Sequence, residues 1–449
     1  MSILHCFAIS VNSETLFPES PPTNIIRTCG LLIVFNDNVS NLGCSPSNQL
    51  MCGMYDTDPN WRENLSQMDV PLSVKNDVLL RDILELTIGG RRISTEHGVQ
   101  LHRSSNLSGI AALADCIKRS RFGENVFYNE NLHVNTTNVC TLACRFCAFR
   151  RGSRSEDAYA LSPEDFISRI GPYSNQIDEV HAVGGLHPTW TVNHYSEMYR
   201  LSKAKFPHIS IKSLTAVEVK HIASRSGISI AETLRILIES GLDSLPGGGA
   251  EILVDSIRDR ICRGKEKSDE YLEIHGIAHS LGIPTNCTML FGTIETIDDR
   301  ILHLHKLRSQ QDSSHGFQCF VPYPFLKDNT RLPEAKIASP SEVIRVIAIS
   351  RIMLDNIPHI KAYRMNIGDH LSAVAINSGA DDIDGTVGHE EIMHEAGSNT
   401  RVDYDSHRLS QLVESSGLTP IKRNSTYSSF NTNSFQPTRQ ALSLPVSGQ

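Results

Sequence analysis

The chain has 449 residues and a formal net charge of −8 at pH 7, with 42 Lys and Arg against 50 Asp and Glu. An isoelectric point of about 6.2 and a mean hydropathy of −0.21 exclude a broadly basic surface for nucleic acid. No run of about 18 apolar residues, the length of a membrane span, occurs, and the first residues lack the regions of a signal peptide. Eleven cysteines occur without the spacings of a disulfide framework. We therefore expect a soluble, cytoplasmic enzyme without nucleic acid or membrane partners.

The beginning of the chain differs in composition from the rest. Pro, Ser, Asn and Cys are frequent in residues 1–67, and the apolar run 30–35 has no periodic neighbours. We expect residues 1–67 to be an irregular, poorly ordered extension and Met68 to begin the catalytic part. Residues 429–449 are rich in Ser, Asn, Thr and Gln without apolar periodicity, which predicts a disordered tail. Residues 68–428 are expected to form one domain with accessory helices at both ends.

Apolar residues at helical spacing predict two helices, over 77–85 and 107–118, in the first part of this domain. From about residue 133, apolar runs of strand length alternate with amphipathic helical segments. The predicted strands are 133–139, 178–184, 209–215, 242–246, 284–291 and 316–322. The predicted helices are 163–170, 195–205, 230–239, 269–281, 298–310, 339–354 and 409–416. This alternation is typical of an α/β fold, and we predict a (βα) TIM-like barrel, full or partial, with its chemistry on the loops after the strands.

The loop after the first predicted strand holds three cysteines, Cys140, Cys144 and Cys147, at spacings of four and three residues. This spacing brings three thiolates around one metal centre, and thiolates select zinc, copper(I) or iron–sulfur clusters. A structural zinc site needs a fourth ligand, for which His133 is a candidate, and an electron-transfer iron–sulfur protein also uses four. Thiols packed as small apolar groups are a further alternative. A cluster held by three cysteines leaves one iron open to a small molecule, and we favour it because an apolar strand leads into the loop.

Glycines follow two other predicted strands. Gly184–Gly185 come after the second strand, where glycine lets the backbone approach a ligand closely, although an ordinary tight turn has the same sequence. After the fourth strand, Gly247, Gly248 and Gly249 offer bare backbone to a flat adenosine or aromatic substrate. Glu251 at the end of this run is a candidate carboxylate for ribose hydroxyls or proton transfer, or alternatively an acid at a helix N-terminus.

The cysteine spacing resembles that of the radical S-adenosylmethionine (radical SAM) superfamily, and Phe146, just before the last cysteine, is part of the resemblance. After the fifth predicted strand, Thr288, Gly292 and Glu295 resemble a degenerate form of the superfamily's adenine-contacting motif, with Thr288 in place of its first glycine. Many members have an acidic residue after the paired glycines, where this chain has Leu186. The resemblance implies a [4Fe–4S] cluster on the three cysteines and S-adenosylmethionine as cosubstrate beside the glycine loops.

Further motifs narrow this resemblance to one family. They resemble aminodeoxyfutalosine synthase, of the futalosine route to menaquinone, from about residue 70 to about residue 428, and lie at 181–188, 212–218, 246–251, 288–292, 356–363 and 379–386. Two sister families share most of them: cyclic dehypoxanthinyl futalosine synthase, a cyclase of the same route, and the deazaflavin-forming synthase that joins tyrosine to a pyrimidine. Residues 183–188 together with 211–218 are more similar to aminodeoxyfutalosine synthase.

The resemblance implies a transferase that adds a 5′-deoxyadenosyl radical to 3-[(1-carboxyvinyl)oxy]benzoate. Rearrangement and decarboxylation then give 6-amino-6-deoxyfutalosine. An external one-electron reductant such as flavodoxin or ferredoxin is also implied. Because this substrate carries two carboxylates and an aromatic ring, its pocket should contain cations and hydrogen-bond donors. The candidate catalytic residues are Glu251, His187, Lys212 and Arg351, with Lys361 and His394 as further candidates, and each is alternatively structural.

Overall fold

The computed structural model describes residues 25–28, 31–34 and 57–431. The chain divides into two units, 1–49 and 50–449. In the first unit, β1 (Ile25–Thr28) and β2 (Leu31–Val34) form an antiparallel pair. The expectations for the rest of residues 1–56 and for residues 432–449 lie outside the described residues. None of the described helices combines the length and the apolar character that crossing a membrane requires.

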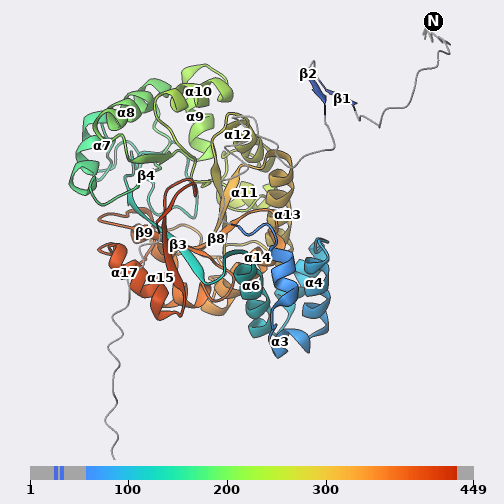
Figure 1. The fold of residues 1–449 in the computed structure, drawn as a ribbon. Helices are drawn as coiled ribbons and strands as arrows, with labels where there is room; N and C mark the ends of the chain where they lie inside the picture. The colour runs from blue at the N-terminus through green and yellow to red at the C-terminus, as the bar shows by residue number, and fades with distance from the viewer. Residues whose placement is uncertain (1–24, 29–30, 35–56, 432–449) are drawn as a thin grey trace, which may run out of the picture. The chain divides into compact units, whose positions relative to one another are not determined.

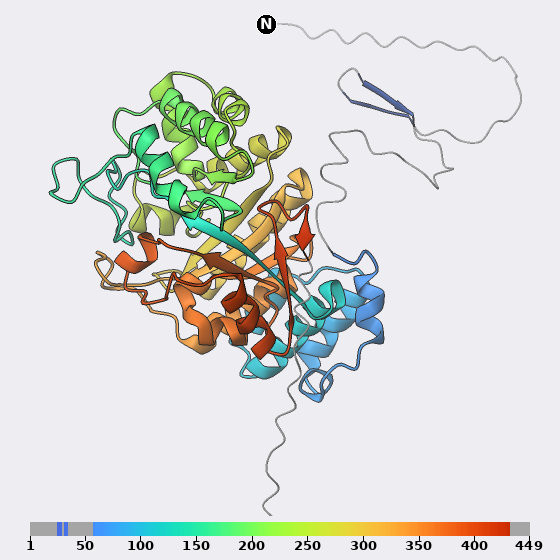
Figure 2. The same ribbon diagram turned by 60° about the vertical axis from the view of Figure 1, so that its left-hand side comes forward.

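The second unit is built on a ring of parallel strands (Figure 1, Figure 2). β3 pairs on one side with β4, which pairs with β5, and on the other side with β9, which is followed by β8, β7 and β6. Isolated parallel bridges, Lys212 with Ser244 and Leu245 with Thr285, join β5 to β6 and close the ring. The predicted α/β barrel is therefore confirmed. The strands are β3 (Asn125–His133), β4 (Glu179–Ala182), β5 (Ser210–Ser213), β6 (Thr285–Phe291), β7 (Phe317–Pro324), β8 (His359–Ala362) and β9 (Asp382–Thr386).

Helices connect successive strands and lie around the outside of the ring, as Figures 1 and 2 show. Most of them bury apolar residues, as α7 does with Phe166 and Ile170, which is the usual arrangement of parallel sheets with crossover helices. The predicted helices 163–170 and 230–239 have the same bounds as α7 and α10. The helices are α7 (Pro163–Ile170), the short 3₁₀ helix η1 (Gly171–Tyr173), α8 (Val192–Lys205), α9 (Ala216–Ser226), α10 (Ile230–Glu239), α11 (Asp255–Ile261), α12 (Ser268–Ser280), α13 (Ile297–Ser314), α14 (Pro340–Met353), α15 (Arg364–Ala375), α16 (Ile392–Glu395) and α17 (Ser406–Ser415).

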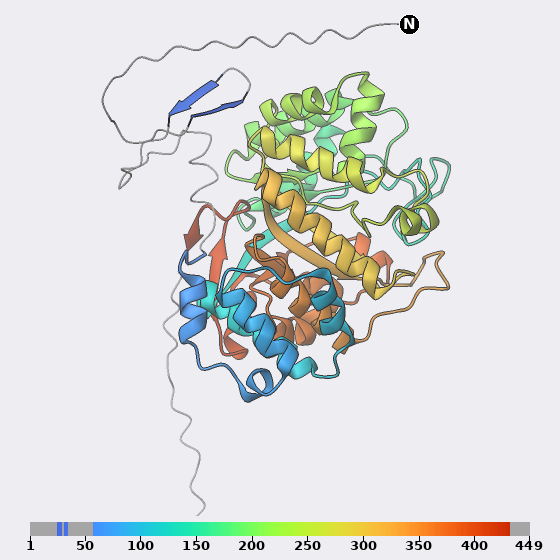
Figure 3. The same ribbon diagram turned by 90° about the vertical axis from the view of Figure 1, so that its right-hand side faces the viewer.

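Five helices that precede the barrel pack together against α13 and α14 (Figure 3). The ring of Trp61 lies between the guanidinium groups of Arg62 and Arg121, at 4.3 and 4.2 Å from its centroid, and Leu65 is fully buried. Residues 61–67 were expected in the irregular extension but form a packed helix, so we propose a domain boundary before Trp61. These helices are α2 (Trp61–Gln67), α3 (Leu72–Lys75), α4 (Val78–Ile88), α5 (Thr95–Arg103) and α6 (Leu107–Phe122).

The strand predicted over 133–139 is wrong in position, because β3 ends at His133. The residues that follow form a loop in which polar side chains bond to neighbouring loops. The Asn135 amide donates to the Val183 carbonyl oxygen at 3.0 Å, and the Thr137 hydroxyl donates to the Tyr159 carbonyl oxygen at 2.6 Å. These side-chain bonds fix the cysteine loop together with isolated backbone bridges, Thr137 with Ala160 and Val139 with Arg151.

The remaining strand predictions differ in how well they hold. Those over 178–184, 209–215, 284–291 and 316–322 match β4, β5, β6 and β7 to within two residues at each end. The strand predicted over 242–246 is reduced to the two bridges at Ser244 and Leu245. At this position the barrel wall is held by isolated bridges alone.

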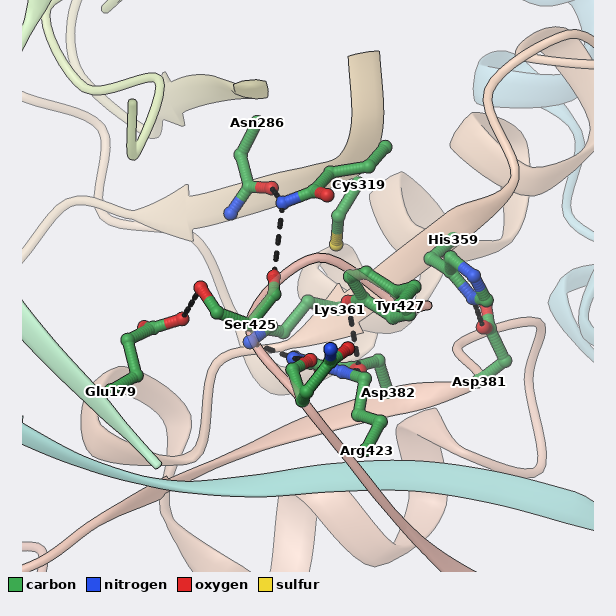
Figure 4. A network of polar contacts seen from close by, with 12 residues as sticks. Glu179, Asn286, Cys319, His359, Lys361, Asp381, Asp382, Arg423, Ser425 and Tyr427 are labelled. Atoms are coloured by element: carbon green, nitrogen blue, oxygen red, sulfur yellow. Dashed lines mark hydrogen bonds and ion pairs between the residues drawn. The ribbon is translucent and has the colours of Figure 1, made fainter. Parts of the chain in front are cut away.

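The last part of the described chain closes the amino end of the ring (Figure 4). β10 runs parallel to the start of β3, and the segment after it turns into the barrel. Arg423 binds the Asp382 carboxylate, with Nη2 3.0 Å from Oδ1, and the Tyr427 hydroxyl donates to Oδ2 of the same group at 2.8 Å. The Ser425 hydroxyl donates to Glu179. The carboxyl end of the ring of strands therefore remains available for a binding site. The last strands are β10 (Thr419–Arg423) and β11 (Phe430–Asn431).

Candidate active site

A cavity of about 270 Å³ lies at the carboxyl ends of the strands. It is lined by His133 at the end of β3, Thr215 after β5, Leu290 of β6, Tyr323 of β7 and Tyr363 after β8. Most of its wall is apolar. Because barrel enzymes carry their active sites at this end of the strands, the cavity is the candidate active site.

Cys140, Cys144 and Cys147 all line this cavity, and all three thiols are free. Burial raises the pKa of Cys144 to about 12 and also raises the pKa of Cys147. A bound cation reverses this effect, since metal ligation deprotonates a thiol. Among the described residues, no group of three or more His, Cys, Asp or Glu side chains is arranged to hold one metal ion. Three free thiols facing one space fit a [4Fe–4S] cluster, in which each thiolate binds a different iron and one iron stays open.

The paired glycines line the cavity beside the cysteine loop. A Cβ on Gly185 would lie 2.3 Å from the Val139 carbonyl oxygen, so this crossing of two loops requires glycine. The backbone N–H of Gly184 donates to Oε1 of Glu218 at 2.9 Å. Glu218 is 1% exposed, and its other oxygen accepts from the backbone N–H and the hydroxyl of Thr215, each at 2.7 Å. Sequence reasoning missed this carboxylate, which holds the glycine loop from outside the cavity.

Two of the three consecutive glycines, Gly248–Gly249, form part of the cavity wall. Gly247 lies behind them with φ of +80°, and a Cβ there would lie 2.2 Å from the Asn286 carbonyl oxygen. Its own carbonyl oxygen accepts from the hydroxyls of Tyr271 at 2.6 Å and Thr288 at 2.9 Å. Thr288, which also lines the cavity, therefore fixes the bare backbone that a flat ligand would contact.

Glu251 lines the cavity and forms an ion pair with Lys265, which also lines it. The Lys265 ammonium lies 5.6 Å from the ring centroid of Phe146 in the cysteine loop. Burial lowers the pKa of Lys265, but the Glu251 carboxylate and the Cys144 thiol outweigh it and hold this pKa above its usual value. A buried ammonium beside the cysteine wall is suited to bind a carboxylate. No motif or spacing in the sequence pointed to Lys265.

A second polar group lines the same cavity. His133, the candidate fourth metal ligand, stacks on His181 with the ring centroids 4.4 Å apart, and its Nδ1 lies 4.0 Å from Glu390. Tyr323 and Tyr363 lie edge to face, with centroids 4.9 Å apart. All five side chains line the cavity. Apart from His133, none was among the predicted site residues, because single polar residues at strand ends produce no recognisable spacing.

Lys212, predicted to be catalytic, is not among the cavity-lining residues. Its ammonium is 2.7 Å from Glu179 at the amino end of the ring. Lys361 is likewise 3.0 Å from Asp382 in the network of Figure 4. Both side chains are buried, and both charges are compensated there. This placement contradicts the direct substrate contact expected of them.

Arg351 and His187 also lie outside the cavity lining. Arg351 is fully buried on α14, forms an ion pair with Asp381 and donates to the carbonyl oxygens of Pro358 and Gly379, each at 2.8 Å. It therefore holds the turn before β9. The ring of His187 stacks on Trp190, with centroids 4.4 Å apart. Of the four predicted catalytic residues, only Glu251 lines the cavity.

The three residues of the predicted adenine-contacting motif do not all lie at the cavity. Thr288 is at the cavity, whereas Gly292 and Glu295 are not. Glu295 accepts from the backbone N–H of Gly292 at 2.6 Å and from Nε of Arg300 at 2.8 Å, so both residues shape the turn between β6 and α13. His394 is also outside the lining, and its Nε2 lies 2.8 Å from the Thr400 carbonyl oxygen.

Comparison with known proteins shows the family to which the chain belongs. Residues 134–307 match the model of the radical SAM superfamily, and residues 314–435 match the model described as the CofH/MqnC C-terminal region. Aminodeoxyfutalosine synthase of Thermus thermophilus is 34% identical over 356 residues, which cover 78% of this chain and 96% of that protein. The chain belongs to this family of radical SAM enzymes. Its cofactors are accordingly a [4Fe–4S] cluster and S-adenosylmethionine.

Sister enzymes in this family are equally similar to the chain. Cyclic dehypoxanthine futalosine synthase of Streptomyces coelicolor is 35% identical over 355 residues, covering 78% of this chain and 88% of that enzyme. The 5-amino-6-(D-ribitylamino)uracil–L-tyrosine 4-hydroxyphenyl transferase of Methanoculleus marisnigri is 35% identical over 355 residues, covering 78% and 97%. Sequence identity therefore establishes the radical SAM family but does not distinguish between the substrates of its members.

Solved structures agree with this family at the level of the fold. Methylornithine synthase (PylB) superposes with a TM-score of 0.61 at 18% identity, covering 75% of this chain and 97% of that one. HydG, a maturase of the [FeFe]-hydrogenase, gives 0.61 at 16% identity, covering 83% and 80%. This radical SAM chain thus has the barrel of enzymes with different activities.

Proposed function

We propose that this radical SAM enzyme is an aminodeoxyfutalosine synthase. The 5′-deoxyadenosyl group of S-adenosylmethionine would be added to the enol-ether double bond of 3-[(1-carboxyvinyl)oxy]benzoate. Rearrangement through the ring and loss of the carboxylate as carbon dioxide or bicarbonate would give 6-amino-6-deoxyfutalosine and one methionine. The cluster, when bound, supplies the electron that cleaves S-adenosylmethionine, and it receives that electron from a reductant such as flavodoxin or ferredoxin.

One observation supports this proposal above the others: a single cavity contains the cysteines, the glycine walls and the aromatic side chains. Addition to carbon requires the adenosyl group and the aromatic substrate to be in contact, at about 3–3.5 Å between the reacting atoms. The bare backbone of Gly248–Gly249 gives adenosine a flat surface. Tyr323 and Tyr363 provide ring surfaces in the same space. Both reactants would therefore share one largely apolar site.

Different residues of the cavity would bind the cluster, S-adenosylmethionine and the substrate. Cys140, Cys144 and Cys147 would hold the cluster. Lys265 is the buried cation for a carboxylate of S-adenosylmethionine or of the substrate, and Glu251 balances its charge while keeping an oxygen for ribose hydroxyls. These assignments rest on the lining of the cavity and on the chemistry of the donor groups.

The fate of the adenosyl group tests the proposal. The reconstituted enzyme should transfer label from adenosine-labelled S-adenosylmethionine into a product that also contains the benzoate ring. One methionine should be released for each product. In the sister reactions, the radical abstracts hydrogen and leaves as 5′-deoxyadenosine. Recovery of the label mainly as free 5′-deoxyadenosine, with a product that lacks adenine, would reassign the chain to one of the sister enzymes.

A further inference from the structure

One part of the cavity wall has no role in the contacts proposed above for the cluster and S-adenosylmethionine. It consists of His133 at the end of β3, His181 on β4 and Glu390 after β9. His133 and Glu390 are each only 4% exposed. The two imidazole rings are stacked within 16° of parallel. We call these three side chains the floor group.

The polar atoms of the floor group have incomplete partners. Oε2 of Glu390 accepts from the backbone N–H groups of Met393 at 2.8 Å and His394 at 3.2 Å. Its Oε1 lies 4.0 Å from Nδ1 of His133, which is longer than a hydrogen bond. Within the described part of the chain, that buried Nδ1 has no hydrogen-bond partner. Because a buried polar atom without a partner costs free energy, the gap indicates a place for a polar atom of a ligand.

Burial disfavours the charged forms of the side chains in the floor group. Burial raises the pKa of Glu390 to about 7 and lowers the pKa of His181 to about 4, and it also lowers the pKa of His133. The nearest lysines, Lys212 and Lys361, are paired with carboxylates at 2.7 and 3.0 Å. A carboxylate at the floor would therefore meet hydrogen-bond donors but no unpaired ammonium among the described residues. The titratable groups around Glu390 and His133 are His181, Tyr323, Lys361, Tyr363, Asp384, His389 and His394. His389 is itself paired, with its Nε2 3.1 Å from Oε1 of Glu391.

Aromatic and apolar side chains adjoin the floor group. The rings of Tyr323 and Tyr363 meet at 80°, and Met393 lines the same cavity. An edge-to-face pair of this kind presents a ring face and a ring edge to a third aromatic ring. The ligand of the floor group is therefore expected to be planar and apolar next to its polar end.

We propose that Glu390 and His133 bind the carboxylate of an aromatic acid, with Glu390 donating its O–H and His133 a ring N–H. This inference rests on the proposed function, whose substrate keeps its benzoate carboxylate in the product. Because the charges of Lys212 and Lys361 are already paired, the ionised carboxylate enters together with one proton, which stays shared between it and Glu390. Apolar sites in other enzymes keep carboxyl groups protonated as donors in this way.

A purely structural role of Glu390 makes a different prediction. Its Oε2 caps the start of α16, and a glutamine at this position keeps that oxygen acceptor. Glutamine also supplies an N–H to a ligand carboxylate but cannot exchange a proton. Glu390→Gln therefore preserves both the cap and the donor while removing the titration. Glu395→Gln, on the same short helix with a side chain 40% exposed, is the matched control.

The test is the pH dependence of substrate binding. Calorimetric titration of the reconstituted enzyme with 3-[(1-carboxyvinyl)oxy]benzoate should give a Kd that rises about tenfold from pH 6 to pH 8, as expected for a required proton with a pKa of about 7. Titrations in two buffers of different ionisation enthalpy should show proton uptake on binding. Glu390→Gln should bind with a pH-independent Kd, and Glu395→Gln should behave like the wild type. Background cleavage of S-adenosylmethionine should be unchanged in Glu395→Gln.

The possible results separate this inference from the proposed function. Adduct formation by the wild type together with pH-independent binding would overturn the floor assignment alone. If the binding of substrate by Glu390→Gln still weakened as pH rose, the floor assignment would also be overturned. The same holds if Glu390→Gln bound the substrate like the wild type but did not turn it over, because this result would indicate that Glu390 transfers a proton during the reaction. Failure of the wild type to bind the substrate would also overturn it. Proton-linked binding without an adenosyl adduct would support the floor assignment and refute the proposed function.

Discussion

Arg423→Met should destabilise the barrel by about 3 kcal/mol, because it removes the main partner of a buried carboxylate. The side chains of Arg423 and Asp382 are 1% and 0% exposed. Loss of one member of such a pair typically costs about 3–5 kcal/mol. The lower end applies here because Lys361 at 3.0 Å and the Tyr427 hydroxyl at 2.8 Å still bind Asp382.

The effect of Arg423→Met should also depend on pH. Burial raises the pKa of Asp382, but Arg423 and Lys361 outweigh it and hold this pKa well below the usual value. A lowered carboxyl pKa contributes stability that is present above the unfolded value, near 4, and is lost as pH falls below it. The variant should therefore lose less stability than the wild type does when the pH is lowered from neutral towards 3.

The free energy of unfolding is measured by urea titration of the cluster-loaded wild type and variant at neutral pH. Arg408→Met is the control, because the ion pair of Arg408 with Asp403 has side chains 47% and 49% exposed. The control should change the free energy of unfolding by no more than about 0.5 kcal/mol. If Arg423→Met were as stable as this control, the idea that the C-terminal segment holds the amino end of the barrel closed would be refuted.

Three further predictions concern the site and the domain boundary. Cys144→Ala should abolish cluster binding, measured as iron and sulfide content, whereas Cys262→Ala should retain it. Glu218→Gln leaves one buried N–H unpaired and should raise KM for S-adenosylmethionine roughly tenfold. Burial raises the pKa of Glu218 from 4.5 to about 7, so this carboxyl group lowers the stability of the folded wild type as pH rises between these values. Glu218→Gln should abolish that decline in stability. A chain beginning at Met68 lacks Trp61 and should melt below one beginning at Thr57, because a buried indole contributes about 3–5 kcal/mol; equal melting temperatures would restore the original boundary.

The sequence was most informative where a backbone requirement is local. The cysteine spacing and the glycine runs predicted the parts of the cavity wall that approach a ligand closely. Gly185 illustrates why, since a Cβ there would lie 2.3 Å from the Val139 carbonyl oxygen. Such a constraint leaves a mark in a few adjacent residues. The barrel as a class was also predictable, because its strands and helices alternate in apolar periodicity.

Contacts between distant strands were not predictable in this way. β3 was misplaced because Asn129, Glu130 and Asn131 lie at its centre, and these buried polar residues interrupt an apolar pattern. The partners of Lys212 and Lys361 come from other strands, so both looked like free substrate cations. Glu218, which accepts from the backbone N–H of Gly184, lies 34 residues further along the chain, so no local pattern pointed to it.

The distribution of charge in the barrel bears on its radical chemistry. At the amino end, Lys212 and Lys361 are compensated by Glu179 and Asp382, and the C-terminal segment completes this network through Arg423. At the carboxyl end, burial disfavours charge on the floor group, and the ammonium of Lys265 is paired. Closing the amino end with charges therefore lets the other end stay apolar, which suits the addition of a radical to a double bond.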